Sequence, residues 1–380
     1  MTNKRPHIFD LTPDELADVV DGLGMPRFRA KQIMEWVYAK GVADPMRMTN
    51  LSAGDREKLA EHMDFVVGGV LRHERATDGT QKLLVDWAVT EGEAIDQNKS
   101  TAGTGLSVLN NPVGGGTETQ TECVMIPATS EETGKRRKTA CVSSQVGCPV
   151  GCKFCASGLG GLDGNLSAGK IVQQVWQLAQ LPQVGRISNV VFMGMGEPLS
   201  NFPRVVKAAK AMTADWGLGI SGRKITISTV GLPSPMKRLA DEDLPFTLAI
   251  SLHAPNDEIR KQIIPWAERV TVAELIDAGR YYFNKTGREV TLEYILLSGV
   301  NDQPEHAREL AAVSKKLRSN INLIRYNEVA GLPFIRPEND DVYRFQKILK
   351  DAGRVVHIRA SRGRDIAAAC GQLRHEHSNC

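Results

Sequence analysis

Residues 139–155 read TACVSSQVGCPVGCKFC, which places a β-branched, strand-like stretch over 139–145 just before three closely spaced cysteines. From here onward, stretches typical of strands alternate with stretches typical of helices. We expect strands at 139–145, 189–193, 224–228, 246–252, 290–297, 321–326 and 355–359. We expect helices between them at 170–179, 203–215, 235–239, 272–284, 305–317 and 341–352. Such alternation implies right-handed crossovers and a parallel sheet, so it predicts an α/β protein with a full or partial (β/α) barrel. An open, doubly wound sheet is the alternative.

The three cysteines, Cys148, Cys152 and Cys155, have the spacing CxxxCxxC, and no fourth cysteine belongs to the motif. Iron–sulfur clusters are normally held by cysteine thiolates, usually four. Three thiolates therefore predict a [4Fe–4S] cube with one iron open to a ligand, as the reductive cleavage of S-adenosylmethionine requires. A structural zinc site is the alternative, but it needs four ligands and usually has paired CxxC knuckles. The motif favours radical chemistry, which a cofactor rather than a side chain performs.

The composition is that of an ordinary globular protein, with 380 residues, 42% hydrophobic and 24% charged. The N-terminus lacks the apolar core of a signal peptide, and no stretch approaches the roughly 18 apolar residues of a membrane span. We therefore expect a cytoplasmic protein without a membrane partner. Seven cysteines, an odd number, argue against a disulfide scaffold and favour metal-binding or catalytic thiols.

Two regions precede the barrel. Residues 1–65 carry apolar residues at helical spacing, which predicts a small helical domain whose basic edge is either a solvated face or a binding site. Residues 66–138 predict a short β extension with strands at 81–89 and 122–127. Between these strands, residues 101–120 are rich in Gly, Thr and Asn, which is typical of a mobile insertion.

Polar residues follow the expected strands of the barrel. In parallel α/β folds, the site lies at the carboxyl ends of the strands, so these residues should converge on one rim. Glycines there would allow a cofactor to approach the backbone closely. The residues predicted to contact S-adenosylmethionine are Gly196, Glu197, Ser228, Ser251, His253 and Asn327.

Several longer motifs extend over nearly the whole chain. They are MPRFRAKQIMEWVYAKGV, CVSSQVGCPVGCKFC, NVVFMGMGEPL, ISLHAPNDEIR, INLIRYNEV and DIAAACGQL. On these motifs, and on Cys141 and Cys370 in particular, the chain resembles the radical-SAM RNA methyltransferases that modify carbon 2 of adenosine in large-subunit ribosomal RNA and in tRNA. The resemblance implies a partial (β/α)6 radical-SAM barrel with a catalytic C-terminal segment over 139–380. It also implies that the helical domain over 1–65 binds RNA.

The resemblance also implies a role for each site residue. Cys148, Cys152 and Cys155 would hold the cluster. S-adenosylmethionine would be contacted by Gly196, Glu197, Ser228, Ser251, Leu252, His253 and Asn327. Cys370 would carry the methyl group as S-methylcysteine, Cys141 would be its partner thiol, and Glu122 would be the proton acceptor.

Two extra thiols make chemical sense because carbon 2 of adenine is electron-poor and is not a nucleophile. One S-adenosylmethionine would methylate Cys370, and a second would give the radical that activates this methyl group, so that two are used per turnover. A disulfide between Cys141 and Cys370 would release the product. The electron would come from a donor such as flavodoxin or ferredoxin. Cys123 and Cys380 match no motif.

Other interpretations remain open at this point. The chain departs from the family pattern at 101–120, at 156–166 and around Asn327, which leaves the target undecided among rRNA, tRNA or both, and between carbon 2 and carbon 8. Relatives that act on carbon 8 share the same cysteines and confer ribosomal antibiotic resistance. A radical-SAM enzyme with a non-RNA substrate and a non-catalytic RNA-binding module are further alternatives. Basic residues expected to contact RNA phosphate are Lys135, Arg136, Arg137, Lys138, Arg354, His357, Arg359, Arg362 and Arg364.

Overall fold

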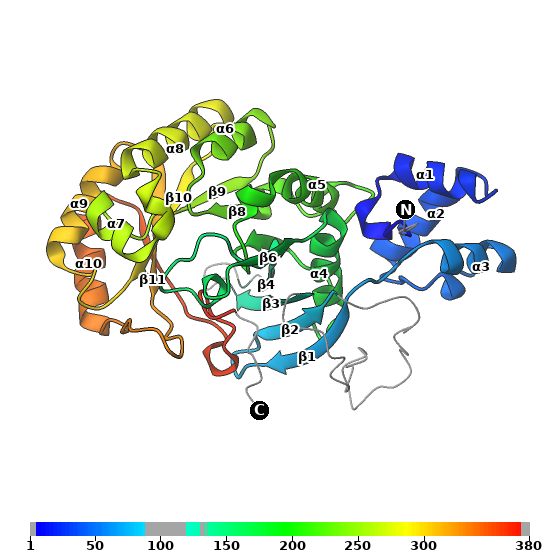
Figure 1. Ribbon diagram of the computed structural model, residues 1–380, viewed down its shortest axis with the longest axis horizontal. Helices are drawn as coiled ribbons and strands as arrows, with labels where there is room; N and C mark the ends of the chain where they lie inside the picture. The colour runs from blue at the N-terminus through cyan, green and yellow to red at the C-terminus, as the bar shows by residue number, and fades with distance from the viewer. Residues whose placement is uncertain (1–4, 88–118, 130–133, 135, 374–380) are drawn as a thin grey trace.

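A computed structural model describes residues 5–87, 119–129, 134 and 136–373. Its main feature is a ten-stranded sheet in the order β1-β2-β3-β4-β7-β8-β9-β10-β11-β12 (Figure 1). Successive strands from β4 to β12 are parallel neighbours. Their bounds are β4 Arg136–Cys141, β7 Asn189–Phe192, β8 Ile225–Thr229, β9 Thr247–Ser251, β10 Val290–Leu296, β11 Ser319–Arg325 and β12 Val356–Arg359.

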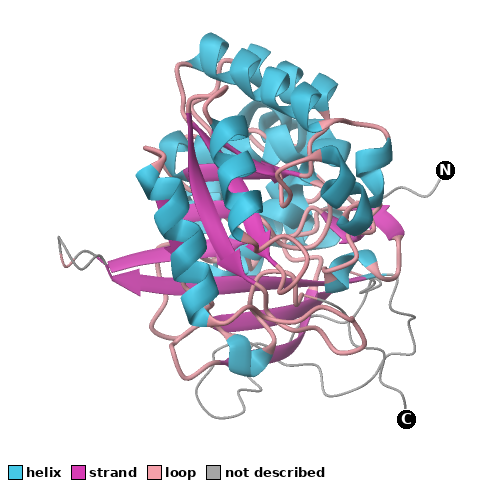
Figure 2. Cartoon of the chain, turned by 90° about the vertical axis from the view of Figure 1, so that its left-hand side faces the viewer, coloured by secondary structure: helices cyan, strands magenta, loops and turns pink. Residues whose placement is uncertain are grey.

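Helices follow six of these strands. They are α4 Ala168–Gln180, α5 Phe202–Thr213, α6 Pro233–Asp241, α7 Asp257–Ile263, α8 Val272–Thr286, α9 Pro304–Ser314 and α10 Asn339–Asp351. Figure 2 shows the helices packed around the strands. The strand order never reverses along the chain, whereas a doubly wound sheet has a switch point. The predicted partial (β/α)6 barrel is therefore confirmed, and the alternative of a doubly wound sheet was wrong.

The short β extension continues the barrel sheet. Its strands are β1 Gly69–Arg75, β2 Gln81–Asp86 and β3 Gln120–Thr129, and each pairs antiparallel with the next, up to β4. The extension therefore brings side chains of β1 to β3 next to the first barrel strand. The insertion predicted at 101–120 lies outside the described residues, apart from its last two positions.

The N-terminal region is helical, with α1 Pro13–Gly22, α2 Arg29–Met34 and α3 Ala53–His62, as the sequence predicted. Helix α1 begins with a capping box, because Thr12 and Glu15 exchange hydrogen bonds between side chain and backbone. In Figure 1 these helices lie to one side of the barrel, next to α4 and α5.

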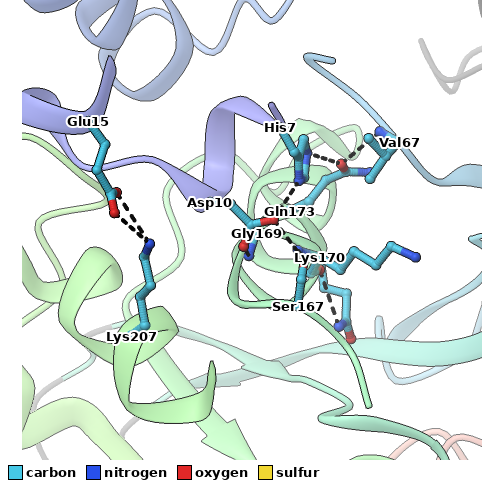
Figure 3. Close-up of polar contacts among 10 residues, drawn as sticks. His7, Asp10, Glu15, Val67, Ser167, Gly169, Lys170, Gln173 and Lys207 are labelled. Atoms are coloured by element: carbon cyan, nitrogen blue, oxygen red, sulfur yellow. Dashed lines mark hydrogen bonds and ion pairs between the residues drawn. The ribbon is translucent and has the colours of Figure 1, made fainter. Parts of the chain in front are cut away.

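The N-terminal region is fixed to helix α4 by buried and partly buried polar contacts (Figure 3). The Asp10 carboxylate accepts hydrogen bonds from Gly169 N at 2.5 Å and from Ser167 Oγ at 2.9 Å. The His7 ring lies 3.0 Å from Gln173 Oε1, which also accepts a hydrogen bond from the Val67 N–H. Since α4 belongs to the first strand–helix unit, the helical domain has a defined position relative to the barrel.

The hydrophobic core lies between the sheet and its helices, and it extends without interruption into the N-terminal region. Strand β10 is buried along its whole length. Within the described residues, no helix combines the length and apolar character that crossing a membrane requires.

Candidate active site

The three motif cysteines lie in the loop between β5 (Gln145–Gly147) and the short helix at 156–158. β5 pairs with β6 (Leu162–Asn165) in a separate hairpin. Gly147 and Gly151 both have positive φ, at 71° and 67°, which favours glycine and makes the loop compact. All three cysteines line one cavity of about 160 Å³ at the carboxyl ends of the barrel strands.

Three cysteines are the kind of donor set that an iron–sulfur cluster takes, whereas a structural zinc site takes four ligands. In the described part of the chain, no group of three or more His, Cys, Asp or Glu side chains is placed to hold a metal ion. Cluster thiolates bind different irons and need not converge on one point, whereas zinc ligands must. Burial raises the pKa of Cys148 to about 12 and also raises those of Cys152 and Cys155. Three such thiols need the positive charge of bound metal to stay deprotonated.

The other walls of this cavity bear most of the residues predicted to bind S-adenosylmethionine. Gly196 and Glu197 follow β7, Ser228 lies in β8, and Ser251 and His253 lie at the end of β9. The Ser228 and Ser251 hydroxyls are 3.5 Å apart. The expected convergence of polar residues at one rim is therefore present for these five.

Glu197 fixes the loop after β7 to the loop after β8. Its carboxylate accepts hydrogen bonds from Leu199 N at 2.9 Å and Val230 N at 2.7 Å. Its own N–H donates to Gln145 Oε1 at 2.7 Å. Burial raises the pKa of Glu197 to about 7. The adjacent Gly196 has φ +101°, and a Cβ there would lie 2.6 Å from Gln145 Cβ, so only glycine fits.

His253 is a neutral hydrogen-bond donor to the cavity. Its Nδ1 accepts a hydrogen bond from Ile295 N at 3.0 Å, so that Nε2 carries the proton. Burial, with the nearby Arg260 charge, lowers its pKa to about 3. The ring also packs edge-on against Phe154 of the cysteine motif, with centroids 5.1 Å apart. His253 thus connects the cofactor cavity with the cysteine loop.

Leu252 and Asn327 are placed differently from these five residues. The Leu252 side chain is fully buried in the hydrophobic core, and its carbonyl accepts a hydrogen bond from Arg260 Nε at 3.1 Å. Asn327 lines a second, smaller cavity of about 70 Å³ and donates a hydrogen bond to the Cys370 carbonyl at 3.2 Å. Neither belongs to the described lining of the first cavity.

Cys370 lines both cavities, and Cys141 lines the second. The loop of Cys370 is held in place because Ala156 N, next to the last motif cysteine, donates to the Gly371 carbonyl at 2.8 Å. Burial, together with the neighbouring Cys370, raises the pKa of Cys141 to about 12. Both thiols are free, so the described structure contains no disulfide between them.

Glu122 lies in β3 and faces a third cavity of about 420 Å³, which Gln372 also lines. Its side chain is 6% exposed, and its carboxylate forms an ion pair with Lys82 Nζ at 2.8 Å. In the sheet, Val124 of the same strand pairs with Cys141. Glu122 and Val124 are two residues apart and point to the same face, so Glu122 and Cys141 lie on one side of the sheet.

Comparison with known proteins identifies the family. Residues 7–64 match the ribosomal RNA large subunit methyltransferase N-terminal domain, and residues 142–311 match the radical SAM superfamily. A probable dual-specificity RNA methyltransferase RlmN from Dictyoglomus thermophilum is 42% identical over 96% of this chain and 95% of that protein. The chain belongs to the RlmN family of RNA methyltransferases.

Further relatives support this assignment. A probable RlmN protein from Symbiobacterium thermophilum is 44% identical, over 95% of this chain and 89% of that protein. The crystal structure of a radical SAM methyltransferase from Sphaerobacter thermophilus superposes on this chain with a TM-score of 0.85 and 37% sequence identity. The match covers 98% of this chain and all of that one. The predicted family and the predicted enzyme class, a radical-SAM RNA methyltransferase, are therefore confirmed. Membership of the family also implies an iron–sulfur cluster and S-adenosylmethionine as cofactors.

The structure of this RlmN-family chain also reveals a pair that sequence reasoning missed. Arg359, for which we predict contact with RNA phosphate, lines both of the cavities that Cys370 lines. Its Nη1 lies 3.4 Å from Glu293 Oε2 and 3.4 Å from Met193 Sδ. The negative charges of Cys370 and Glu293 raise the pKa of Arg359. A carboxylate in the middle of the buried run 290–296 is the signal that could have identified this pair.

Proposed function

We propose that this chain methylates carbon 2 of an adenosine in large-subunit rRNA and in tRNA, with Cys370 as the methyl carrier. The observation that carries the proposal is the position of Cys370 in the wall shared by two cavities, the second of which Cys141 lines. The relatives are named as dual-specificity RNA methyltransferases, which supports action on two kinds of RNA. The choice of carbon 2 depends on the family resemblance.

In this proposal, Cys148, Cys152 and Cys155 hold the [4Fe–4S] cluster. Polar groups available to bind S-adenosylmethionine are the hydroxyls of Ser228 and Ser251 and the Nε2–H of His253. The backbone around Gly196 and Glu197 completes the site. Leu252 and Asn327 contribute through their backbone or through the Cys370 loop. The cluster and two molecules of S-adenosylmethionine per turnover supply the methyl group and the radical that activates it, with the electron coming from a donor such as flavodoxin or ferredoxin.

The side chains that complete the reaction are Glu122 and Cys141. Once the carbon carried by Cys370 has bonded to carbon 2 of the base, the adduct must lose one electron and one proton. The electron would pass to the oxidised cluster, and Glu122 would accept the ring proton. The Cys141 sulfur then forms a bond with the Cys370 sulfur while the bond between Cys370 and the methyl carbon breaks. The bonding electrons leave with that carbon, which takes up a proton, and a thiol reductant reduces the resulting disulfide. The charge of Arg359 favours the thiolate of Cys141 in this step.

The helical domain over 1–65 would bind and orient the RNA. Its fixed contact with α4 through Asp10 supports this role, because a bound RNA would be held at a constant distance from the barrel. An adenosine that is single-stranded or turned out of its helix can enter the site, whereas a paired one must first be flipped.

The test is anaerobic reconstitution of the full chain with iron, sulfide and S-adenosylmethionine, followed by mass spectrometry of the Cys370 peptide and of RNA digests. We expect a methyl group on Cys370, release of 5′-deoxyadenosine, and 2-methyladenosine in both rRNA and tRNA substrates. Cys370→Ala should abolish turnover, and Cys141→Ala should leave the enzyme covalently bound to RNA. Unmethylated Cys370 in active protein, or 8-methyladenosine as the product, would contradict the proposal.

A further inference from the structure

The third cavity, of about 420 Å³, is the most highly charged of the cavities next to the Cys370 loop. Strands β1 to β3 form one of its walls, and two loop segments of the C-terminal half form the other. Its charged lining residues are Arg72, Glu74, Lys82, Glu122, Glu328, Arg364 and Asp365. Ala156 and Gln372, which also line it, lie next to Cys155 and close to Cys370 in the sequence. The cavity therefore borders the segments that carry Cys155 and Cys370, and it has the polar walls that a nucleotide requires.

Lys82 is the most buried cation of this cavity. Its side chain is 8% exposed and lies between two carboxylates, with Nζ at 2.8 Å from Glu122 Oε1 and 3.1 Å from Glu74 Oε2. Lysines are almost never buried unless they are paired. A buried lysine in an ion pair contributes little net stability compared with an apolar side chain, so its presence here calls for an explanation other than folding.

The sheet register places Lys82 in line with Cys141. Val124 of β3 pairs with Lys82 on one side and with Cys141 on the other. Glu74 pairs directly with Lys82 on the opposite edge. Residues that pair across a sheet share a face, so Glu74, Lys82 and Cys141 form one row, with Glu122 one position away on the same face.

We propose that Lys82 is a positioning residue of the methyl transfer: it holds the Glu122 carboxylate in the cavity that receives the target adenosine. This inference depends on the proposed function, in which Glu122 accepts the ring proton. Glu74, whose side chain is 30% exposed, is the second counter-ion of Lys82. When Glu122 becomes neutral by accepting a proton, Glu74 still balances the lysine charge, so Lys82 stays in place and can pair with Glu122 again once the proton has left.

The decisive variants are Lys82→Met, which keeps the length of the side chain but removes the charge, and Lys82→Arg, which keeps the charge. Lys207→Met is the matched control, because Lys207 pairs with Glu15 at 3.2 Å near the N-terminal region, far from this cavity (Figure 3). Each full-length variant is reconstituted anaerobically, and the assays measure Cys370 methylation, release of 5′-deoxyadenosine, RNA product and covalent protein–RNA adduct.

We expect Lys82→Met to methylate Cys370 and release 5′-deoxyadenosine normally, but to accumulate covalent adduct with at least tenfold less free RNA product at pH 7. Without Lys82, the buried Glu122 carboxylate loses the cation that lies 2.8 Å away and holds it in the cavity, and burial then disfavours its charged form. Product formation should therefore increase as the pH rises, and Lys82→Arg should restore most of it at pH 7. The other charged residues that line this cavity are the five named above, and they are unchanged in these variants.

Two results would overturn the role of Lys82. One is wild-type product yield and no adduct in Lys82→Met. The other is a loss of Cys370 methylation together with a lowered unfolding temperature in both Lys82 variants, which would indicate a structural role. Failure of the proposed function itself is distinguishable, because wild-type protein would then show no methyl group on Cys370.

Discussion

The docking of the N-terminal region on α4 makes the substitution Gly169→Ala a sharp test of the packing. Gly169 lies in the first turn of α4, where the backbone of Ile8–Asp10 crosses it (Figure 3). A Cβ at this position would be 2.5 Å from His7 Nδ1, 2.7 Å from Asp10 Cγ and 2.8 Å from Asp10 N. Since one of these atoms belongs to the backbone, rotating a side chain cannot relieve the clash.

The expected cost follows from three terms. Forcing a methyl group into a packed site costs about 1–3 kcal/mol. Displacing Asp10 weakens its hydrogen bonds to Gly169 N and Ser167 Oγ, and the loss of a helix cap costs about 0.5–2 kcal/mol. Alanine recovers about 0.5–1 kcal/mol of helix propensity. The net result should be destabilisation by roughly 1–4 kcal/mol, with the N-terminal region released from α4.

The matched control is Gly54→Ala in α3, where a Cβ would meet no atom within 4 Å. The same chemical change should stabilise the protein there by about 0.5–1 kcal/mol, so the two variants should differ in sign. Urea unfolding followed by circular dichroism gives both free energies, and limited proteolysis near residue 65 reports release of the domain. If both variants were equally stable, or if Gly169→Ala were stabilised, the close approach of Asp10 to α4 would be refuted.

Three further predictions concern the site. Arg359→Met should lower the free energy of unfolding by about 3–5 kcal/mol, because Glu293 stays buried without its cation. The double variant with Glu293→Gln should regain most of this lost stability, as measured by urea titration. Cys148→Ser should lose bound iron after reconstitution, whereas Cys123→Ser, in the core, should retain it when iron is measured colorimetrically. The pKa of His253 is about 3 when folded and 6.5 when free, so the unfolded state binds the proton first and stability should decrease as the pH falls from 6.5 toward 3. In His253→Asn, the stability should depend less on pH, which urea unfolding midpoints measured between pH 4 and 7 would show.

The barrel could be predicted from the sequence because each strand–helix unit repeats the same apolar pattern. Of the elements that the sequence analysis missed, two have a clear physical reason. Strand β1, GVLRHER, is buried at its start and partly exposed beyond it, so its composition resembles a loop. Helix α7 has only seven residues, although Asn256 caps it by accepting a hydrogen bond from Ile259 N at 3.0 Å, which was a usable signal.

The candidate site could be predicted where a motif carries it and not where distant residues meet. The cysteines and the residues after β7, β8 and β9 follow strand ends, so their convergence is implied by the fold. Arg359 and Glu293 are 66 positions apart, and their pairing depends on the register of β10, β11 and β12. Lys82 could not be assigned because its partners come from two other strands of the extension.

The arrangement of the cavities has a consequence for how a single thiol can serve two reactions. Cys370 borders both the cavity of the motif cysteines and the cavity of Cys141. Its loop is anchored on both sides, by Asn327 to the Cys370 carbonyl and by Ala156 to the Gly371 carbonyl. Because the backbone is anchored, the Cys370 sulfur can move only by rotation about its side-chain bonds. Under the proposed mechanism, it would therefore turn from the cavity of the motif cysteines to that of Cys141 without displacement of the loop. Asn327→Ala should then loosen this loop and slow product release more than methylation of Cys370. Single-turnover assays measure the two steps separately. Equal slowing of both steps would contradict the role of the anchored loop.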